Sequence, residues 1–224
     1  MKITWIGQAG LLIEKNGFKI LVDPYLSDSV FKIEPGKHRR VPVMQDLFDI
    51  KPNLMIFTHN HLDHYDPETV PHFITPETEI TVLGSPQAYD EAVKIGGNNN
   101  YIRFIPHTVW TEGGLKFTSV KAVHSEPTAI GVIIQDGDKK YYITGDTLYN
   151  EDIFEDIPQD IYAVFLPING VGNNMNMIDA KNFCDKIKPK FAVPIHCGMF
   201  DSIDMNEFEY ESKIIPELYK EIIF

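Results

Sequence analysis

The sequence has few cysteines, a shortage of basic residues and no long apolar run, and each of these excludes a class of protein. Two cysteines, Cys184 and Cys197, are too few for a disulfide scaffold and lack CxxC spacing, so they predict reduced thiols in a cytoplasmic protein. Twenty Lys and Arg residues against 32 Asp and Glu give a formal net charge of −12. This balance argues against nucleic acid as a partner, because affinity for phosphate backbones depends on clustered basic residues.

No apolar stretch reaches the length that a membrane-spanning helix needs, so a membrane is not expected as a partner. The N-terminal stretch MKITWIGQAGLLIEKNGF also lacks the continuous apolar segment of a signal peptide, because Glu14 and Lys15 interrupt it. What the chain does have is a hydrophobic content of 43%, which is ample for a substantial core. We expect one domain that spans residues 1–224.

Short runs of the β type recur along the chain between Gly, Asn, Asp and Pro residues, among them KITWIG, FKILVD, LMIFTH and KKYYITGD. Helical patterns occur at residues 86–95 and 176–187, and a further helix is predicted from about Asp204 to the C-terminus, kinked at Pro216. The runs YAVFLPI and FAVPIH are continuously apolar, as in strands that are covered on both faces. The sequence therefore predicts sheets between helices, with residues 26–46 as a long aperiodic loop.

The segment THNHLDHYD, residues 58 to 66, holds three of the eight histidines and two aspartates. Burying so many ionisable groups without partners would be costly, and a metal ion is the first candidate to neutralise them. His59 and His61 are two residues apart and can face one ion, whereas Asp63 and His64 extend beyond them towards a second.

Candidate ligands also stand at the ends of apolar runs elsewhere in the chain. His59 ends LMIFT, His124 ends VKAV, Asp146 ends YYITG and His196 ends AVPI. Strands that end at one edge of a sheet would bring these residues to a shared site, and a carboxylate such as Asp146 can bridge two cations. We therefore predict two divalent ions per chain, held by His59, His61, Asp63, His64, His124, Asp146 and His196.

THNHLDHYD resembles the HxHxDH signature of the metallo-β-lactamase superfamily, and AVHSE, ITGDT and VPIHCGMF resemble its later motifs in the same order. With ILVDPYL and LPINGVGNNMNMIDA, the sequence looks most like the branch that includes ascorbate-6-phosphate lactonase. The resemblance implies an α+β fold, a four-layer αββα sandwich with two metal sites at one edge. It implies that one ion is held by His59, His61 and His124, the other by Asp63, His64 and His196, with Asp146 bridging them.

The expected function is hydrolysis by a metal-activated water, acting on a lactone or another ester of a small metabolite, with or without a phosphate group. Asp63 is the catalytic candidate, because it could orient the water and move its proton. A phosphodiester is the alternative substrate, and a non-catalytic metal-binding or sensing module is the alternative of another class. Zinc, manganese and iron all suit mixed histidine and carboxylate ligands, so the identity of the metal is open.

Four further residues are weaker candidates, and each has a structural alternative. Asp23 would orient a ligand histidine or simply form a turn before Pro24. Asn169 would contact the substrate or only shape its loop. Arg39 and Arg40, in the basic loop KIEPGKHRRVP, would bind an anionic group of the substrate or remain solvated at a subunit contact, which leaves a homo-oligomer open.

Overall fold

The computed structural model describes residues 1–224 and contains two six-stranded sheets. The first sheet has the order β1 (Lys2–Gly7), β2 (Gly10–Lys15), β3 (Phe18–Val22), β4 (Leu54–Phe57), β5 (Thr81–Gly84) and β6 (Asn100–Arg103). The second has the order β12 (Phe191–Ile195), β11 (Ile161–Pro167), β10 (Lys139–Ile143), β9 (Ile130–Asp136), β8 (Leu115–Lys121) and β7 (Val109–Glu112). The β-type runs of the sequence are confirmed as strands of these sheets.

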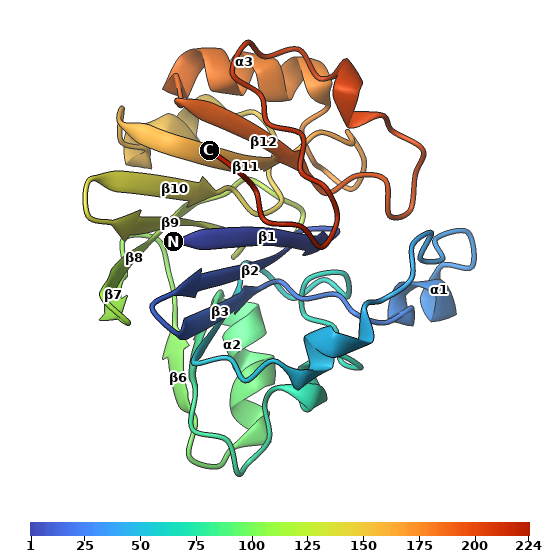
Figure 1. Cartoon of the computed structure of the whole chain (residues 1–224), viewed down its shortest axis with the longest axis vertical. Coiled ribbons are helices and arrows are strands. Elements are labelled where there is room, and N and C mark those ends of the chain that lie inside the picture. Colours follow the sequence, from blue (N-terminus) through green and yellow to red (C-terminus); the bar gives the residue numbers. More distant parts are fainter.

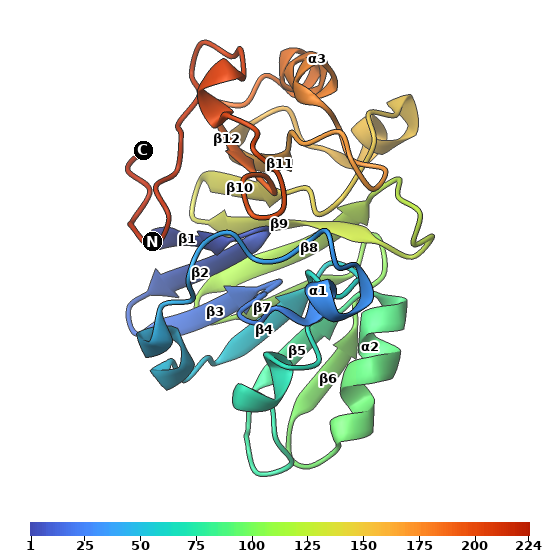
Figure 2. The same cartoon turned by 90° about the vertical axis from the view of Figure 1, so that its right-hand side faces the viewer.

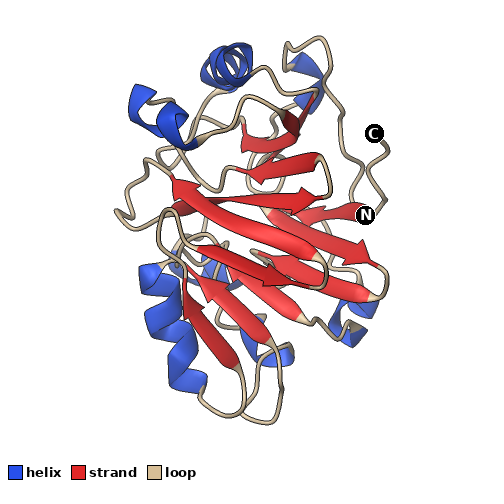
Figure 3. Cartoon of the chain, turned by 90° about the vertical axis from the view of Figure 1, so that its left-hand side faces the viewer, coloured by secondary structure: helices blue, strands red, loops and turns tan.

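The two sheets pack face to face, because both of them contribute to the largest hydrophobic cluster, which has 22 buried residues. The outer face of the second sheet is covered by α3 (Met177–Ile187), whose Phe183 and Cys184 pack with Val164 of β11. The outer face of the first sheet is covered by α2 (Pro86–Ala92), whose Ala88 packs with Val82 of β5. Helices thus lie outside both sheets (Figures 1 and 3), and the predicted αββα sandwich is confirmed.

The helices predicted at residues 176–187 and 86–95 are confirmed, the second as α2 followed by the 3₁₀ turn η3 (Val93–Ile95). The aperiodic stretch contains one short helix, α1 (Ser29–Ile33), and the 3₁₀ turn η1 (Gln45–Asp49). The other 3₁₀ turns are η2 (Val70–His72), η4 (Glu151–Asp156) and η5 (Met205–Glu207). None of the helices combines the length and apolar character needed to cross a bilayer.

The predicted C-terminal helix is wrong, since the only helical turn after residue 203 is η5. The backbone donors of this segment bond to strands instead: the N–H of Ile222 donates to the carbonyl of Ile3 at 2.8 Å, and that of Tyr219 to Trp5 at 2.9 Å. The segment therefore runs back along β1 and brings the two termini side by side (Figures 1 and 2).

The topology directs many strand ends to one edge of the sandwich. In the first sheet β3 and β4 are parallel, so Asp23 and His59 follow neighbouring strand ends. In the second sheet β10, β11 and β12 are parallel, and Asp146 and His196 follow β10 and β12. Residues that are distant in the sequence therefore meet at this edge.

Candidate metal centre

All seven predicted ligands lie together at this edge of the sandwich. Their side chains form three groups, and within each group the potential ligand atoms lie within 4.8 Å of one another. The groups are His59, His61 and His124; His59, His64 and Asp146; and Asp63, His64 and His196. The first and third groups coincide with the two ligand sets that the family resemblance implies, which we call the first and second sets.

Asp146 lies between the two sets. Its Oδ1 is 3.2 Å from Nε2 of both His64 and His196. Its Oδ2 is 4.0 Å from Nε2 of both His59 and His124. One carboxylate oxygen thus faces each set, which is the arrangement that a bridging ligand requires.

Hydrogen bonds outside the centre orient two of the histidines. Asp23 Oδ2 is 2.9 Å from His64 Nδ1, so it can accept the Nδ1–H and leave Nε2 directed into the centre. The hydroxyl of Thr58 donates to the same Asp23 oxygen at 2.6 Å and lies 3.2 Å from His59 Nδ1. Asp23 is fully buried and has a left-handed backbone with a φ of 42°, so the chain bends at this residue, which also contacts His64.

The residues fit divalent metal ions. Nε2 of His59 is buried and has no hydrogen-bond partner, although buried polar atoms normally have one. Burial holds the pKa of His59 well below its usual range, so the ring is neutral. Because the Thr58 hydroxyl donates to Asp23, it can only accept a hydrogen bond from His59 Nδ1, and Nε2 is then the nitrogen that presents a lone pair. Imidazole and carboxylate donors together suit zinc, manganese and iron. A metal cation at this position would bind the unpaired nitrogen of His59.

Charges in the second set are balanced between imidazoles and carboxylates. Burial would raise the pKa of Asp63, but His64 and His196 hold it below its usual range. Burial would likewise lower the pKa of His64, but Asp146 and Asp23 hold it well above its usual range. The carboxylates are therefore ionised, as they must be to bind a cation, whereas His64 is protonated and would lose its Nε2 proton to bind one.

One loop contacts ligands from both sets. This asparagine loop, residues 169–176, follows β11, and its Asn174 donates an amide N–H to Asp146 Oδ2 at 2.8 Å. The N–H of Thr147 donates to Asn174 Oδ1 at 3.1 Å, which fixes the orientation of that amide. The backbone carbonyl of Asn173 lies 3.3 Å from Nδ1 of His124, a ligand of the first set.

Asn169, the predicted substrate-binding residue of this loop, lies with its amide 3.2 Å from Nδ1 of His196 and also lines the cavity above the centre. It is the amide nitrogen that faces His196, while the amide oxygen accepts the backbone N–H of Val171 at 3.4 Å.

Sequence reasoning did not single out Gln8, Thr58 or Asn174. Gln8 is buried at a φ of 49°, and its amide donates to Asp63 Oδ2 at 2.8 Å and lies 3.1 Å from His196 Nε2. Its position directly after β1, at the same edge as the ligands, is the signal that could have identified it. Cys197, next to His196, is buried and free, and burial raises the pKa of its thiol to about 12.

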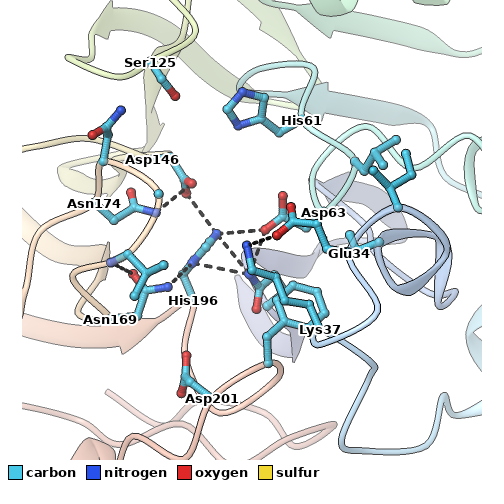
Figure 4. A pocket seen from close by; sticks show the side chains of 18 of the residues that line it. Glu34, Lys37, His61, Asp63, Ser125, Asp146, Asn169, Asn174, His196 and Asp201 are labelled. Atoms are coloured by element: carbon cyan, nitrogen blue, oxygen red, sulfur yellow. Dashed lines mark hydrogen bonds and ion pairs between the residues drawn. The ribbon is translucent and has the colours of Figure 1, made fainter.

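The two predicted substrate-binding arginines are not in the cavity lining. The Arg39 guanidinium donates to the carbonyls of Tyr25 at 2.6 Å and Val41 at 2.9 Å, so it fastens the loop to the fold. Arg40 is exposed. The basic residue of this loop that does line the cavity is Lys37, which lies across it from Asn169 (Figure 4).

The family model described as the beta-lactamase superfamily domain matches residues 2–196. This chain belongs to the beta-lactamase superfamily. The UPF0173 metal-dependent hydrolase of Sulfolobus acidocaldarius is 28% identical, and the match covers 99% of this chain and 95% of the relative. The corresponding protein of Carboxydothermus hydrogenoformans is 29% identical, with 95% and 92% covered.

Solved structures share the fold. Igni18, a metallo hydrolase from Ignicoccus hospitalis, superposes with a TM-score of 0.77 at 20% identity, covering 99% of this chain and 97% of its own. An isothiocyanate hydrolase from Delia radicum gut bacteria gives a TM-score of 0.77 at 18% identity, covering 100% and 99%. The expected superfamily is thereby confirmed, and family and relatives support a metal-dependent hydrolase, whereas the lactonase-like branch stays a prediction.

Proposed function

We propose that this protein holds two divalent metal ions and hydrolyses a lactone or another ester of a small metabolite. One observation carries the proposal: two sets of inward-facing ligand atoms lie on either side of Asp146, with one of its oxygens directed at each set. The preference for a lactone is supported by the resemblance of the sequence to the ascorbate-6-phosphate lactonase branch.

The first ion would be held by His59, His61 and His124, and the second by Asp63, His64 and His196. When bound, such ions supply an acidified water, with its pKa moved from about 15.7 towards about 7, and a polarised substrate carbonyl. Zinc, manganese and iron are all compatible with these donors.

Asp63 would transfer the proton of the attacking water. Its carboxylate lines the cavity, and one oxygen is held by the Gln8 amide, so its orientation is fixed. It would take a proton as the water oxygen bonds to the carbonyl carbon, and would return it to the departing oxygen as the ester C–O bond breaks. The products are a carboxylic acid and an alcohol, joined in one molecule when the substrate is a lactone.

A phosphodiester is the second candidate substrate, because ligand sets on either side of one carboxylate also suit the in-line displacement of phosphoryl transfer. Purified protein loaded with zinc, manganese or iron would be assayed against a panel of lactones and against bis-p-nitrophenyl phosphate. Lactone hydrolysis that is lost on chelation and restored by metal is the expected result. Turnover of the phosphodiester alone would favour the second candidate.

The Asp146→Asn variant distinguishes the two candidate enzymes, an ester or lactone hydrolase and a phosphodiesterase, from a non-catalytic metal-binding or sensing module. An enzyme should lose bound metal and turnover together, because Asp146 contacts both sets. Loss of metal with every biochemical readout unchanged would favour the module. Metal analysis of the wild type should give two equivalents per chain.

A further inference from the structure

The cavity above the metal centre has two facing walls. It measures about 620 Å³. One wall comes from α1 and the residues after it, including Glu34 and Lys37, and the other from the asparagine loop, including Asn169 and Asn174 (Figure 4). His196 lies between the two walls, so a substrate at the metal centre must extend between them.

Both walls present apolar side chains to the cavity. Val30 and Ile33 are three residues apart on α1 and share one face of it, and Ile33 is 69% exposed. Val171 belongs to the asparagine loop and is 54% exposed. Leu62 and Phe200 complete the apolar part of the lining. An exposed branched side chain on each wall gives a ligand apolar surface to cover.

The walls offer no free cation to an anionic substituent. Lys37 is the only Lys or Arg in the lining, and its Nζ lies 2.8 Å from a carboxylate oxygen of Glu34. Apart from the predicted ligands, the other ionisable lining side chain is the carboxylate of Asp201. A phosphate group held away from the metal ions would meet two carboxylates and a single ammonium that is already paired with one of them, which is unfavourable.

We propose that the substrate is a neutral ester or lactone whose apolar substituent lies between Ile33 and Val171, an inference that rests on the proposed function. The acyl carbon would sit at the metal centre, and the substituent would extend outwards between the walls. The phosphorylated metabolite of the sequence-based expectation fits these walls less well.

Binding of linear carboxylates with four to ten carbons to the metal-loaded protein, measured by calorimetry, tests the inference without requiring turnover. Each ligand presents the acid head group of a product to the metal centre and differs only in its chain. Kd should fall about fourfold for each added methylene until the cavity is filled. A Kd that does not change with chain length would overturn the inference.

Two variants test where the alkyl chain of the ligand lies. Ile33→Ser and Val171→Ser should each reduce the gain per methylene, whereas Ile223→Ser, at a position that is 74% exposed and outside the cavity lining, should leave it unchanged. Melting temperatures identify any variant that fails to fold. If both wall variants keep the full fall in Kd per methylene, the alkyl chain does not lie between Ile33 and Val171.

A charged chain end provides the last comparison. A carboxylate that carries a terminal phosphate should bind no more tightly than its unsubstituted counterpart, and tighter binding would overturn the inference. If Kd falls with chain length but no ester is hydrolysed, the result would count against the proposed function alone. If esters are hydrolysed but Kd does not change with chain length, the result would count against the inference alone.

Discussion

At the scale of single residues, Thr58 connects histidines of the two ligand sets. Its hydroxyl donates to Asp23, which holds His64, and the same oxygen lies 3.2 Å from His59 Nδ1. Thr58→Val keeps the shape of the side chain but removes the hydroxyl. We expect the free energy of unfolding to fall by about 1–3 kcal/mol and metal affinity by about 10–100-fold. Urea unfolding and competition with a chelator measure the two effects. Thr118→Val, which removes a hydroxyl on β8, is the matched control.

Asn174 tests whether the asparagine loop holds the metal centre in place. Asn174→Leu removes the donor to Asp146 Oδ2 and the acceptor for the Thr147 N–H. Because Asp146 lies between the sets, affinity for each of the two proposed ions should fall by about 10–100-fold. The same substitution at Asn150, which caps the 3₁₀ turn η4, should leave metal affinity unchanged. Equal metal affinities in the two variants would show that the loop contact has no effect on binding.

At the scale of elements, local pattern predicted the helix α3, whose hydrogen bonds are internal, and the central strands, whose runs are continuously apolar. It failed for residues 204–224, where apolar spacing indicated a helix but the backbone bonds to strands far away in the chain. Phe208 and Ile222 of this segment are buried, so its apolar residues do pack inwards and only the helical period was misassigned. Tertiary contacts thus decided the conformation of this segment.

The C-terminal segment should contribute to stability through its last residue. The Phe224 ring contacts the rings of Tyr141, Tyr162 and Phe191, with centroids 5.4 to 5.8 Å apart within this cluster. Phe224→Ala should lower the free energy of unfolding by about 1.5–3 kcal/mol, with an unchanged urea m-value. Ile223→Ala, at the exposed neighbouring position, should change it by less than about 0.5 kcal/mol. Similar values for both variants would mean that the aromatic packing adds nothing.

At the scale of the whole molecule, the ligands were predictable because each one stands at or just beyond the end of an apolar run. Their supporting contacts were not, since these join residues that no local pattern relates: Gln8 and Asp63 are 55 positions apart. The basic loop shows the same limit. Its charge suggested anion binding, but only the tertiary structure shows that Arg39 bonds to the fold and that Lys37 pairs with Glu34. Composition therefore indicated the chemistry of the site better than the direction of its side chains.

Metal removal should destabilise the whole fold, because the candidate ligands come from both sheets and the proposed ions would link the two sheets at one edge. An ion that binds only the folded state stabilises it by about 4 kcal/mol when its free concentration is 1,000 times its Kd. A chelator should therefore lower the melting temperature of the wild type, and added metal should restore it. Asp146→Asn controls for direct effects of the chelator, because a variant that binds metal poorly should respond little. An unchanged wild-type transition after verified metal removal would mean that hydrogen bonds such as those of Asp23 and Asn174 hold the empty centre together without the ions.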